Sequence, residues 1–325
     1  MGVKATICKS TFVCVLLVFG LVPGSGAAPR PAASVRRAAD ANRILALQIC
    51  LDRRGLSCNT LDGVNGRKTQ VALATWCALN GKPYTPGLET TAWETFFPNE
   101  RNLFTTQIVT AQDVAALVKI PKTPEGKAAL PRMGYETLQE MFAERGRLSQ
   151  TMLKKLNPTL AWPNPPVGAA VKIPFFPPER TRSRKADSTA SVLRVSLSRF
   201  EITAFDERGR LIALFPCSIA ASKKNLPPEG ELHVVTNLAN PDYTYTPDHP
   251  PKGRRVERRM FKPGPNNPVG LAWIGLSLPG YGIHGTPEPE RIGRPASHGC
   301  FRLANWNAVR LHKLCTLGTA VVIEK

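Results

Sequence analysis

Residues 284–300 read HGTPEPERIGRPASHGC, which places Cys300 directly after His298 and Gly299 and puts a second histidine, His284, sixteen positions upstream of the cysteine. The chain has only five histidines, so two of them around one short loop form an informative pattern. A cysteine attacks as its thiolate, which needs a base close in space. The stretch therefore predicts an acyl-transfer site with Cys300 as the nucleophile.

The residues beside Cys300 fit this chemistry. Gly299 lets the backbone approach a substrate closely, and the N–H groups of Gly299 and Cys300 are expected to form an oxyanion hole. Arg302 could clamp a substrate carboxylate through two parallel hydrogen bonds, although a structural salt bridge accounts for it nearly as well.

Three other roles compete for Cys300. A zinc site with His284 and His298 would need a third firm ligand, and the sequence places none at ligand spacing. A disulfide with Cys315 stays open, and an inert buried thiol would not explain the two histidines. We expect no metal and no cofactor.

Residues 265–308 resemble the signature region of the L,D-transpeptidase family, also called the YkuD domain. The matching elements are His284-Gly285-Thr286, Ser297-His298-Gly299-Cys300 and Arg302-Leu303. The resemblance extends at lower identity over residues 191–325. Phe301, where a smaller aliphatic residue is common, and Asn307, at a position that is often acidic, depart from the pattern.

The resemblance implies a catalytic domain that acts on peptidoglycan. Cys300 would attack the carbonyl of the third residue of a stem tetrapeptide, D-alanine would leave, and a thioester would form. His284 would be the base, with His298 in support, and the implied substrate-binding residues are Arg302, Ser297, Gly285 and Tyr281. If an amine attacks the thioester, the reaction is transpeptidation; if water attacks it, the enzyme is an L,D-carboxypeptidase. A non-catalytic protein that binds peptidoglycan is the alternative function.

The rest of the chain predicts a multidomain protein whose C-terminal part, residues 191–325, is mainly β. Apolar residues there alternate with polar ones from Leu193 onward, which is the period of a half-buried strand. Residues 306–314 form the one clear helix of this part. Residues 177–190, PPERTRSRKADSTA, lack apolar periodicity and are expected to be a linker.

Two upstream segments have patterns of their own. In residues 43–80, apolar residues at helical spacing flank a Gly-rich turn, which predicts two short helices. Residues 43–97 resemble the bacterial peptidoglycan-binding domain. Residues 133–176 predict two helices flanked by short strands and resemble an α+β LysM module, a binder of N-acetylglucosamine polymers. The peptidoglycan-binding resemblance depends on Leu47-Gln48, Gly55, Asp62-Gly63, Gly66, Thr69 and Ala72-Leu73.

The N-terminus predicts secretion. Residues 1–28 combine two lysines, the apolar run 12–22 and a small-residue cleavage region, as signal peptides do. That run is shorter than the ~20 residues of a membrane span, so we expect no transmembrane segment in the mature chain and a place in the periplasm or cell wall. In a secreted protein, a net charge of +19 favours anionic wall polymers over nucleic acid as binding partners. The alternative is that the charge serves only to keep the protein soluble.

The cysteines leave several pairings open. Two of the eight lie in the signal peptide, and the others form two sets of three, so each set could hold one disulfide and one thiol. The sets are Cys50, Cys58 and Cys77, and Cys217, Cys300 and Cys315.

Overall fold

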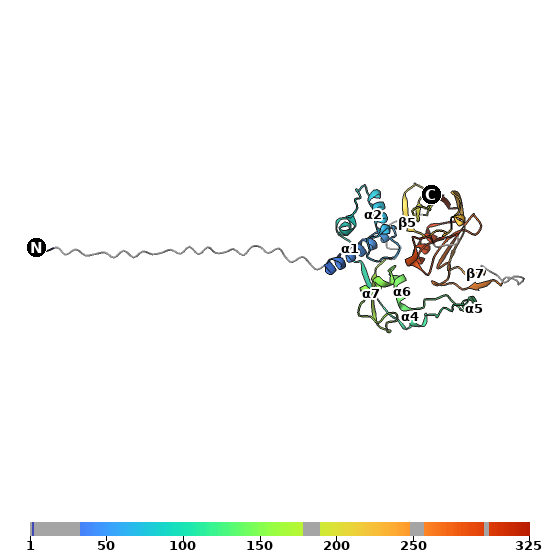
Figure 1. Ribbon diagram of the computed structural model, residues 1–325, viewed down its shortest axis with the longest axis horizontal. Coiled ribbons are helices and arrows are strands. Elements are labelled where there is room, and N and C mark those ends of the chain that lie inside the picture. The colour runs from blue at the N-terminus through green and yellow to red at the C-terminus, as the bar shows by residue number, and fades with distance from the viewer. Residues whose placement is uncertain (1, 3–32, 178–188, 248–256, 296–298) are drawn as a thin grey trace.

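The computed structural model describes residue 2 and residues 33–177, 189–247, 257–295 and 299–325 (Figure 1). The signal peptide, most of the expected linker, and the site residues Ser297 and His298 lie outside the described residues. None of the described helices is long and apolar enough to cross a membrane.

The C-terminal part is built on an eight-stranded sheet in the order β11-β10-β9-β6-β12-β3-β4-β5. Its strands are β3 (Val192–Ser196), β4 (Glu201–Phe205), β5 (Leu211–Pro216), β6 (Gly230–Ala239), β9 (Ala272–Leu276), β10 (Gly282–His284), β11 (Phe301–Arg302) and β12 (Ala320–Glu324). Helix α8 (Asn305–Leu314) packs against β6, β9 and β10. The predicted mainly-β domain is confirmed.

Alternating side chains explain the sheet. In β4 and in β12 every second residue is buried, so each strand turns one apolar row toward the core. Phe215, Phe301 and Leu311 are fully buried there and join the sheet to α8. Phe301 therefore fills the core directly after Cys300. A hairpin of β7 (Tyr243–Tyr245) and β8 (Arg259–Phe261) stands apart as a separate two-stranded sheet.

The N-terminal half is mainly helical, with one small sheet. Its elements are α1 (Ala33–Arg53), α2 (Arg67–Leu79), η1 (Leu88–Thr90), α3 (Ala92–Phe96), β1 (Phe104–Ile108), α4 (Ala111–Ala115), α5 (Pro124–Ala128), α6 (Leu138–Arg145), α7 (Gln150–Leu156) and β2 (Ala170–Pro174). The helix expected to stop at Asn80-Gly81 is α2, with Asn80 as its C-cap.

One sequence expectation about this half is wrong. A strand was expected inside residues 133–176 ahead of the first helix, but the strand that pairs with β2 is β1. β1 lies before α4 and α5, and the segment carrying these two helices separates it from α6. Sheet pairing joins residues far apart in sequence, so periodicity within a short window could not locate this partner.

Within residues 43–80, the residues that carry the peptidoglycan-binding resemblance stabilise the turn between the two helices. Buried Gln48 donates from Nε2 to Asp62 Oδ1 at 2.8 Å and to Thr69 Oγ1 at 3.0 Å. Its Oε1 accepts the backbone N–H groups of Asp62 and Gly63, each at 3.0 Å. These residues therefore shape the loop between α1 and α2. Whether the segment binds peptidoglycan stays a prediction.

The two halves are packed together. Residues of both upstream segments form one hydrophobic cluster, and Leu214 of β5 is buried in it. Leu214 also donates its N–H to Gly55 O at 2.9 Å and accepts Ser57 N–H at 3.0 Å. Gly55 has a φ of +92°, and a Cβ on it would lie 2.7 Å from Ile212 O, so only glycine allows this approach.

Candidate active site

The pairing of β10 with β11 brings the expected catalytic residues together. The strands are parallel, with Ile283 opposite Phe301 and His284 opposite Arg302. Cys300, one residue before Phe301, therefore falls beside Gly282, and the Gly282 N–H donates to the thiol. Side chains two residues apart share a face of a sheet, so Cys300 and His284 lie on one face, as neighbours along it.

His284 is set up as a neutral base. The side chain is 5% exposed, and its ring stacks on that of Trp273 with 5.6 Å between the ring centroids. Its Nδ1 lies 2.6 Å from Gly285 O. A carbonyl only accepts, so Nδ1 carries the hydrogen and Nε2 keeps its lone pair. Burial, with the nearby Arg302 charge, lowers the pKa of His284 to about 4. The imidazole is therefore unprotonated at neutral pH.

Cys300 is a partly exposed thiol at the edge of the core. Burial raises its pKa, whereas the Gly282 N–H and the charge of Arg302 act in the opposite direction. The Sγ atom lies 3.5 Å from Gly280 O, as a donor to that carbonyl. The resting site holds a neutral thiol and a neutral imidazole, so proton transfer has to accompany attack on a substrate.

The other expected site residues have identifiable contacts. Tyr281 donates its hydroxyl to Asn225 O at 3.1 Å, and its ring lies beside Gly299, where an added Cβ would be 3.5 Å away. Gly285 donates its N–H to Ala272 O at 3.1 Å, which anchors the end of β10. The substrate-binding roles of Tyr281, Gly285 and Arg302 and the oxyanion hole stay predictions.

Asn305 is a positioning residue that the sequence analysis missed. It is fully buried, and its Oδ1 accepts Leu271 N–H at 3.2 Å while its Nδ2 donates to Pro265 O at 3.1 Å. A Cβ on Gly285 would lie 2.3 Å from this Oδ1, so Asn305 packs directly against the backbone that supplies the carbonyl for His284. Its place five residues after Cys300, at the start of α8, is the signal that could have found it.

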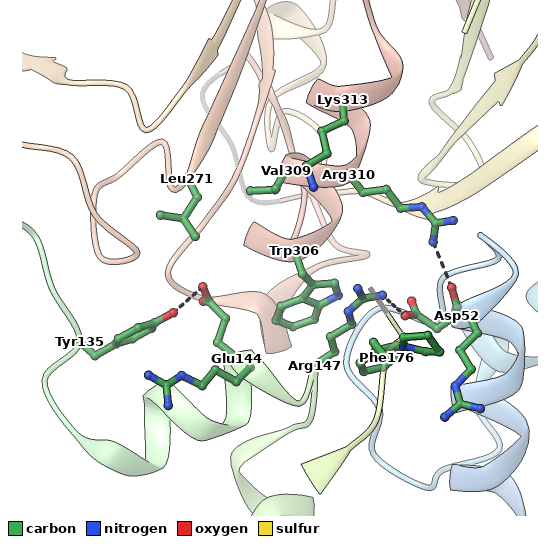
Figure 2. Close-up of a pocket in the computed structure, with 13 residues that line it drawn as sticks. Asp52, Tyr135, Glu144, Arg147, Phe176, Leu271, Trp306, Val309, Arg310 and Lys313 are labelled. Atoms are coloured by element: carbon green, nitrogen blue, oxygen red, sulfur yellow. Dashed lines mark hydrogen bonds and ion pairs between the residues drawn. The ribbon is translucent and has the colours of Figure 1, made fainter. Parts of the chain in front are cut away.

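Glu144 extends this support into the N-terminal half. Its Oε2 accepts from Asn305 Nδ2 at 3.0 Å. Its Oε1 accepts from the Tyr135 hydroxyl at 3.0 Å, a contact that Figure 2 shows. Burial raises the pKa of Glu144 to about 7, although both hydrogen bonds lower it. No local sequence signal marks Glu144, because its partner lies 161 residues away.

We expect Glu144→Gln to change stability in a pH-dependent way. A raised carboxyl pKa means that the favourable contribution is complete below the ordinary value of 4.5 and is lost as pH rises through about 7. The glutamine variant avoids that ionisation. Its stability relative to the parent should increase between pH 5 and pH 8 by on the order of 3 kcal/mol.

Urea denaturation at the two pH values measures this change. Glu207→Gln, at an exposed turn position, is the matched control and should show no such trend. A stability difference for Glu144→Gln that is equal at both pH values would contradict the assignment of a buried, titrating carboxyl.

All six cysteines of the described residues are free thiols, so neither set holds the disulfide that the sequence left possible. Cys300 and Cys315 are therefore not bridged. Among the described residues, no group of three or more His, Cys, Asp or Glu side chains is placed to hold a metal ion.

Comparisons with known proteins find a match over the part of the chain that contains Cys300 and His284. Residues 190–323 match the family model of the L,D-transpeptidase catalytic domain, YkuD. A putative L,D-transpeptidase of Fuscovulum blasticum is 37% identical over 108 residues, which cover 33% of this chain and 56% of that protein. The putative L,D-transpeptidase YqjB of Bacillus subtilis is 35% identical over 112 residues, which cover 33% of this chain and 57% of that protein. The chain thus spans little more than half the length of these two relatives.

Other matches are longer or structural. The putative L,D-transpeptidase YkuD of Bacillus licheniformis is 28% identical over 188 residues, covering 58% of this chain and 93% of that protein. An L,D-transpeptidase from Mycobacterium smegmatis aligns with a TM-score of 0.33 and 15% identity, over 42% of this chain and 59% of the other. L,D-transpeptidase 3 from Mycobacterium tuberculosis aligns with a TM-score of 0.34 and 16% identity, over 42% of this chain and 61% of the other. The family-model match supports an L,D-transpeptidase catalytic domain, YkuD, over residues 190–323.

Proposed function

We propose that this chain is a secreted cell-wall L,D-transpeptidase that uses Cys300 as its nucleophile. One observation carries the proposal: the β10–β11 register sets Cys300 and His284 on the same face of the sheet. The neutral His284, with its hydrogen fixed on Nδ1, adds a base that is ready to accept a proton.

The reaction follows from these groups. Nε2 of His284 takes the thiol proton as Sγ bonds to the carbonyl carbon of the third stem residue. The bond from that carbon to the D-alanine nitrogen breaks, and D-alanine leaves with the proton from His284. The resulting thioester is attacked by an acceptor amine, whose proton passes to His284, and the thiol is regenerated.

The backbone around the nucleophile completes the chemistry. The N–H groups of Gly299 and Cys300 would stabilise the oxyanion of each tetrahedral intermediate, and one such donor contributes ~3 to 4 kcal/mol. The charge of Arg302, which already influences both reacting side chains, would attract a carboxylate of the stem peptide. His298 would support the site, and Ser297 would take part in substrate binding.

The proposed setting is the periplasm or cell wall, reached through the signal peptide of residues 1–28. Peptidoglycan is the proposed partner, with residues 43–97 and 133–176 retaining the enzyme on the polymer. The net charge of +19 would add attraction to anionic wall polymers. Nucleic acid has no part in this proposal.

Mass spectrometry of muropeptides tests the proposal. Purified tetrapeptide muropeptides are incubated with the mature protein, and we expect dimers joined between the third residues of two stems, together with free D-alanine. Stems trimmed by one D-alanine without dimers would assign the L,D-carboxypeptidase activity instead. Unchanged muropeptides would overturn the enzymatic proposal in favour of a wall-binding protein.

A further inference from the structure

Residues 289–294 belong to the stretch of chain that runs from His284 to Cys300, and both halves of the protein contact them. They comprise the short helix η4 (Pro289–Arg291), the buried Ile292 and the two residues after it. We call residues 289–294 the linking segment. Its position bears on the reaction because it lies between the proposed base and the proposed nucleophile along the chain.

Two side chains of the turn and helix after α1 hold the linking segment by its carbonyls. Asn59, which is fully buried, donates from Nδ2 to Pro289 O at 2.7 Å. Lys68 of α2 donates from Nζ to Ile292 O at 2.5 Å. A Cβ on Gly293 would lie 2.7 Å from Lys68 Cε, so the lysine side chain passes directly over the segment. Hydrogen bonds from a charged donor are stronger than neutral ones, so Lys68 is a firm anchor.

Further contacts support these two anchors. Gln150, the first residue of α7, donates its N–H to Glu290 Oε1 at 2.9 Å, so both upstream segments contact the linking segment. Ser57 Oγ accepts from Asn59 N–H and from Asn307 Nδ2, each at 3.0 Å. Asn307 departs from the family pattern, and here its amide supports the turn that carries Asn59.

Ser218 connects the linking segment to the strand that follows Cys300. The residue is buried, and its Oγ accepts the N–H groups of Gly293 at 3.2 Å and Arg294 at 3.4 Å. Its backbone exchanges two hydrogen bonds with Arg302 of β11, each at 2.9 Å. Since β11 begins directly after Cys300, a displacement of the linking segment would act through Ser218 on the backbone that carries the thiol.

We propose that Asn59 and Lys68 are positioning residues for Cys300, an inference that rests on the proposed transpeptidase function. They hold the linking segment, the segment bonds to Ser218, and Ser218 pairs with β11 beside the nucleophile. The N-terminal half then contributes to the rate of acylation as well as to retention on the polymer. A misplacement of reacting groups by about 1 Å can slow a reaction ~10²-fold, so contacts far from the thiol can matter.

The rate of carbapenem labelling in the mature protein tests this role. Asn59→Asp keeps the size of the side chain and suits the φ of +67° at this position, but it removes the amide donor. Lys68→Met keeps an unbranched apolar chain and removes the ammonium group. In each variant the maximal acylation rate should fall ~10 to 10²-fold. The carbapenem concentration that gives half the maximal rate should stay the same, because neither variant removes a group that binds the carbapenem.

Asn99→Asp and Lys122→Met are the matched controls. Both positions are exposed, and both lie in the N-terminal half. Each control makes the same chemical change as its test variant and should be labelled like the parent. Parent-like labelling of both folded test variants would overturn the proposal.

Alkylation by iodoacetamide distinguishes positioning from a loss of structure. This reagent requires only an accessible thiolate, so Cys300 should react at similar rates in the parent and in the test variants. An N-terminal half that has opened would expose the buried thiols of Cys50, Cys58 and Cys77 as well. Slow carbapenem labelling accompanied by alkylation of these three cysteines in both variants would assign Asn59 and Lys68 a structural role and overturn the proposal.

Hydrogen exchange separates this inference from the proposed function. The N–H groups of Gly293 and Arg294 bond to Ser218, and they should exchange faster in both test variants than in the parent. A parent that no carbapenem labels would refute the transpeptidase proposal, and the exchange rates would still decide whether Asn59 and Lys68 hold the segment. A parent that labels, with exchange and labelling unchanged in the variants, would refute the positioning role alone.

Discussion

Replacing Cys300 with alanine is expected to abolish covalent labelling of the protein by a carbapenem, a β-lactam that mimics the acyl donor. The parent should gain the mass of one carbapenem, because the strained amide acylates the thiolate and the opened ring stays attached. Muropeptide turnover should fall by ~10⁴-fold or more, as it does when a nucleophile is removed from a group of residues that act as a unit.

The other cysteines give this experiment its specificity. All six described cysteines are free, and burial raises the pKa of each. Only Cys300 is partly exposed, whereas the other five are buried. We therefore expect a single adduct, located on the peptide that contains Cys300.

Cys315→Ala is the matched control, since it removes a thiol from the same domain and leaves the site intact. It should label like the parent. Intact-mass spectrometry measures both variants, with circular dichroism to verify folding. An adduct on the Cys300→Ala protein would refute the assignment of the nucleophile.

The sequence pointed to Cys300 and His284 because the signals that mark them are local. Cys300 and the histidines surround one loop, and the alternation of apolar residues indicates the strands that carry it. Predicting that the Trp273 ring stacks on His284 would also have required the register between β9 and β10. β9 pairs with β10 such that His284 faces Trp273, and no pattern within either strand states which residues will be opposite each other.

The N-terminal half shows where sequence reasoning stops. Its helices follow from periodicity and caps, for example Ser149, whose hydroxyl accepts Met152 N–H at the start of α7. Its relation to the catalytic domain follows from contacts between residues far apart in the chain. The resemblances to wall-binding modules suggested tethered units, whereas Leu214 of β5, in the eight-stranded sheet, is part of the N-terminal core.

This packing links the N-terminal half to His284 through direct contacts. Glu144 binds Asn305, and Asn305 packs on Gly285, whose carbonyl fixes the tautomer of His284. Each step is a direct contact, and Asn305, Gly285 and His284 are buried. Displacing α6 would therefore disturb the orientation of the base as well as the stability of the chain.

Replacing His284 with alanine is expected to slow acylation by ~10² to 10⁴-fold, the usual contribution of a general base. Removing it leaves a thiol of raised pKa that must lose its proton to water. The pH profile carries the sharper expectation. The folded pKa of His284 is lowered to about 4, so the imidazole becomes protonated, and the acylation rate of the parent falls, only as pH drops toward 4.

A histidine of ordinary pKa would instead lose activity near pH 6.5. The rate of carbapenem labelling, measured by intact mass between pH 4 and pH 8, distinguishes the two profiles. In His284→Ala the acid limb should disappear, and the slow residual rate should rise with pH as more of Cys300 ionises. His233→Ala, at an exposed position on β6, is the control and should keep both the rate and the profile of the parent. Near-normal labelling by a folded His284→Ala protein would transfer the base role to another group, and His298 would be the first to examine.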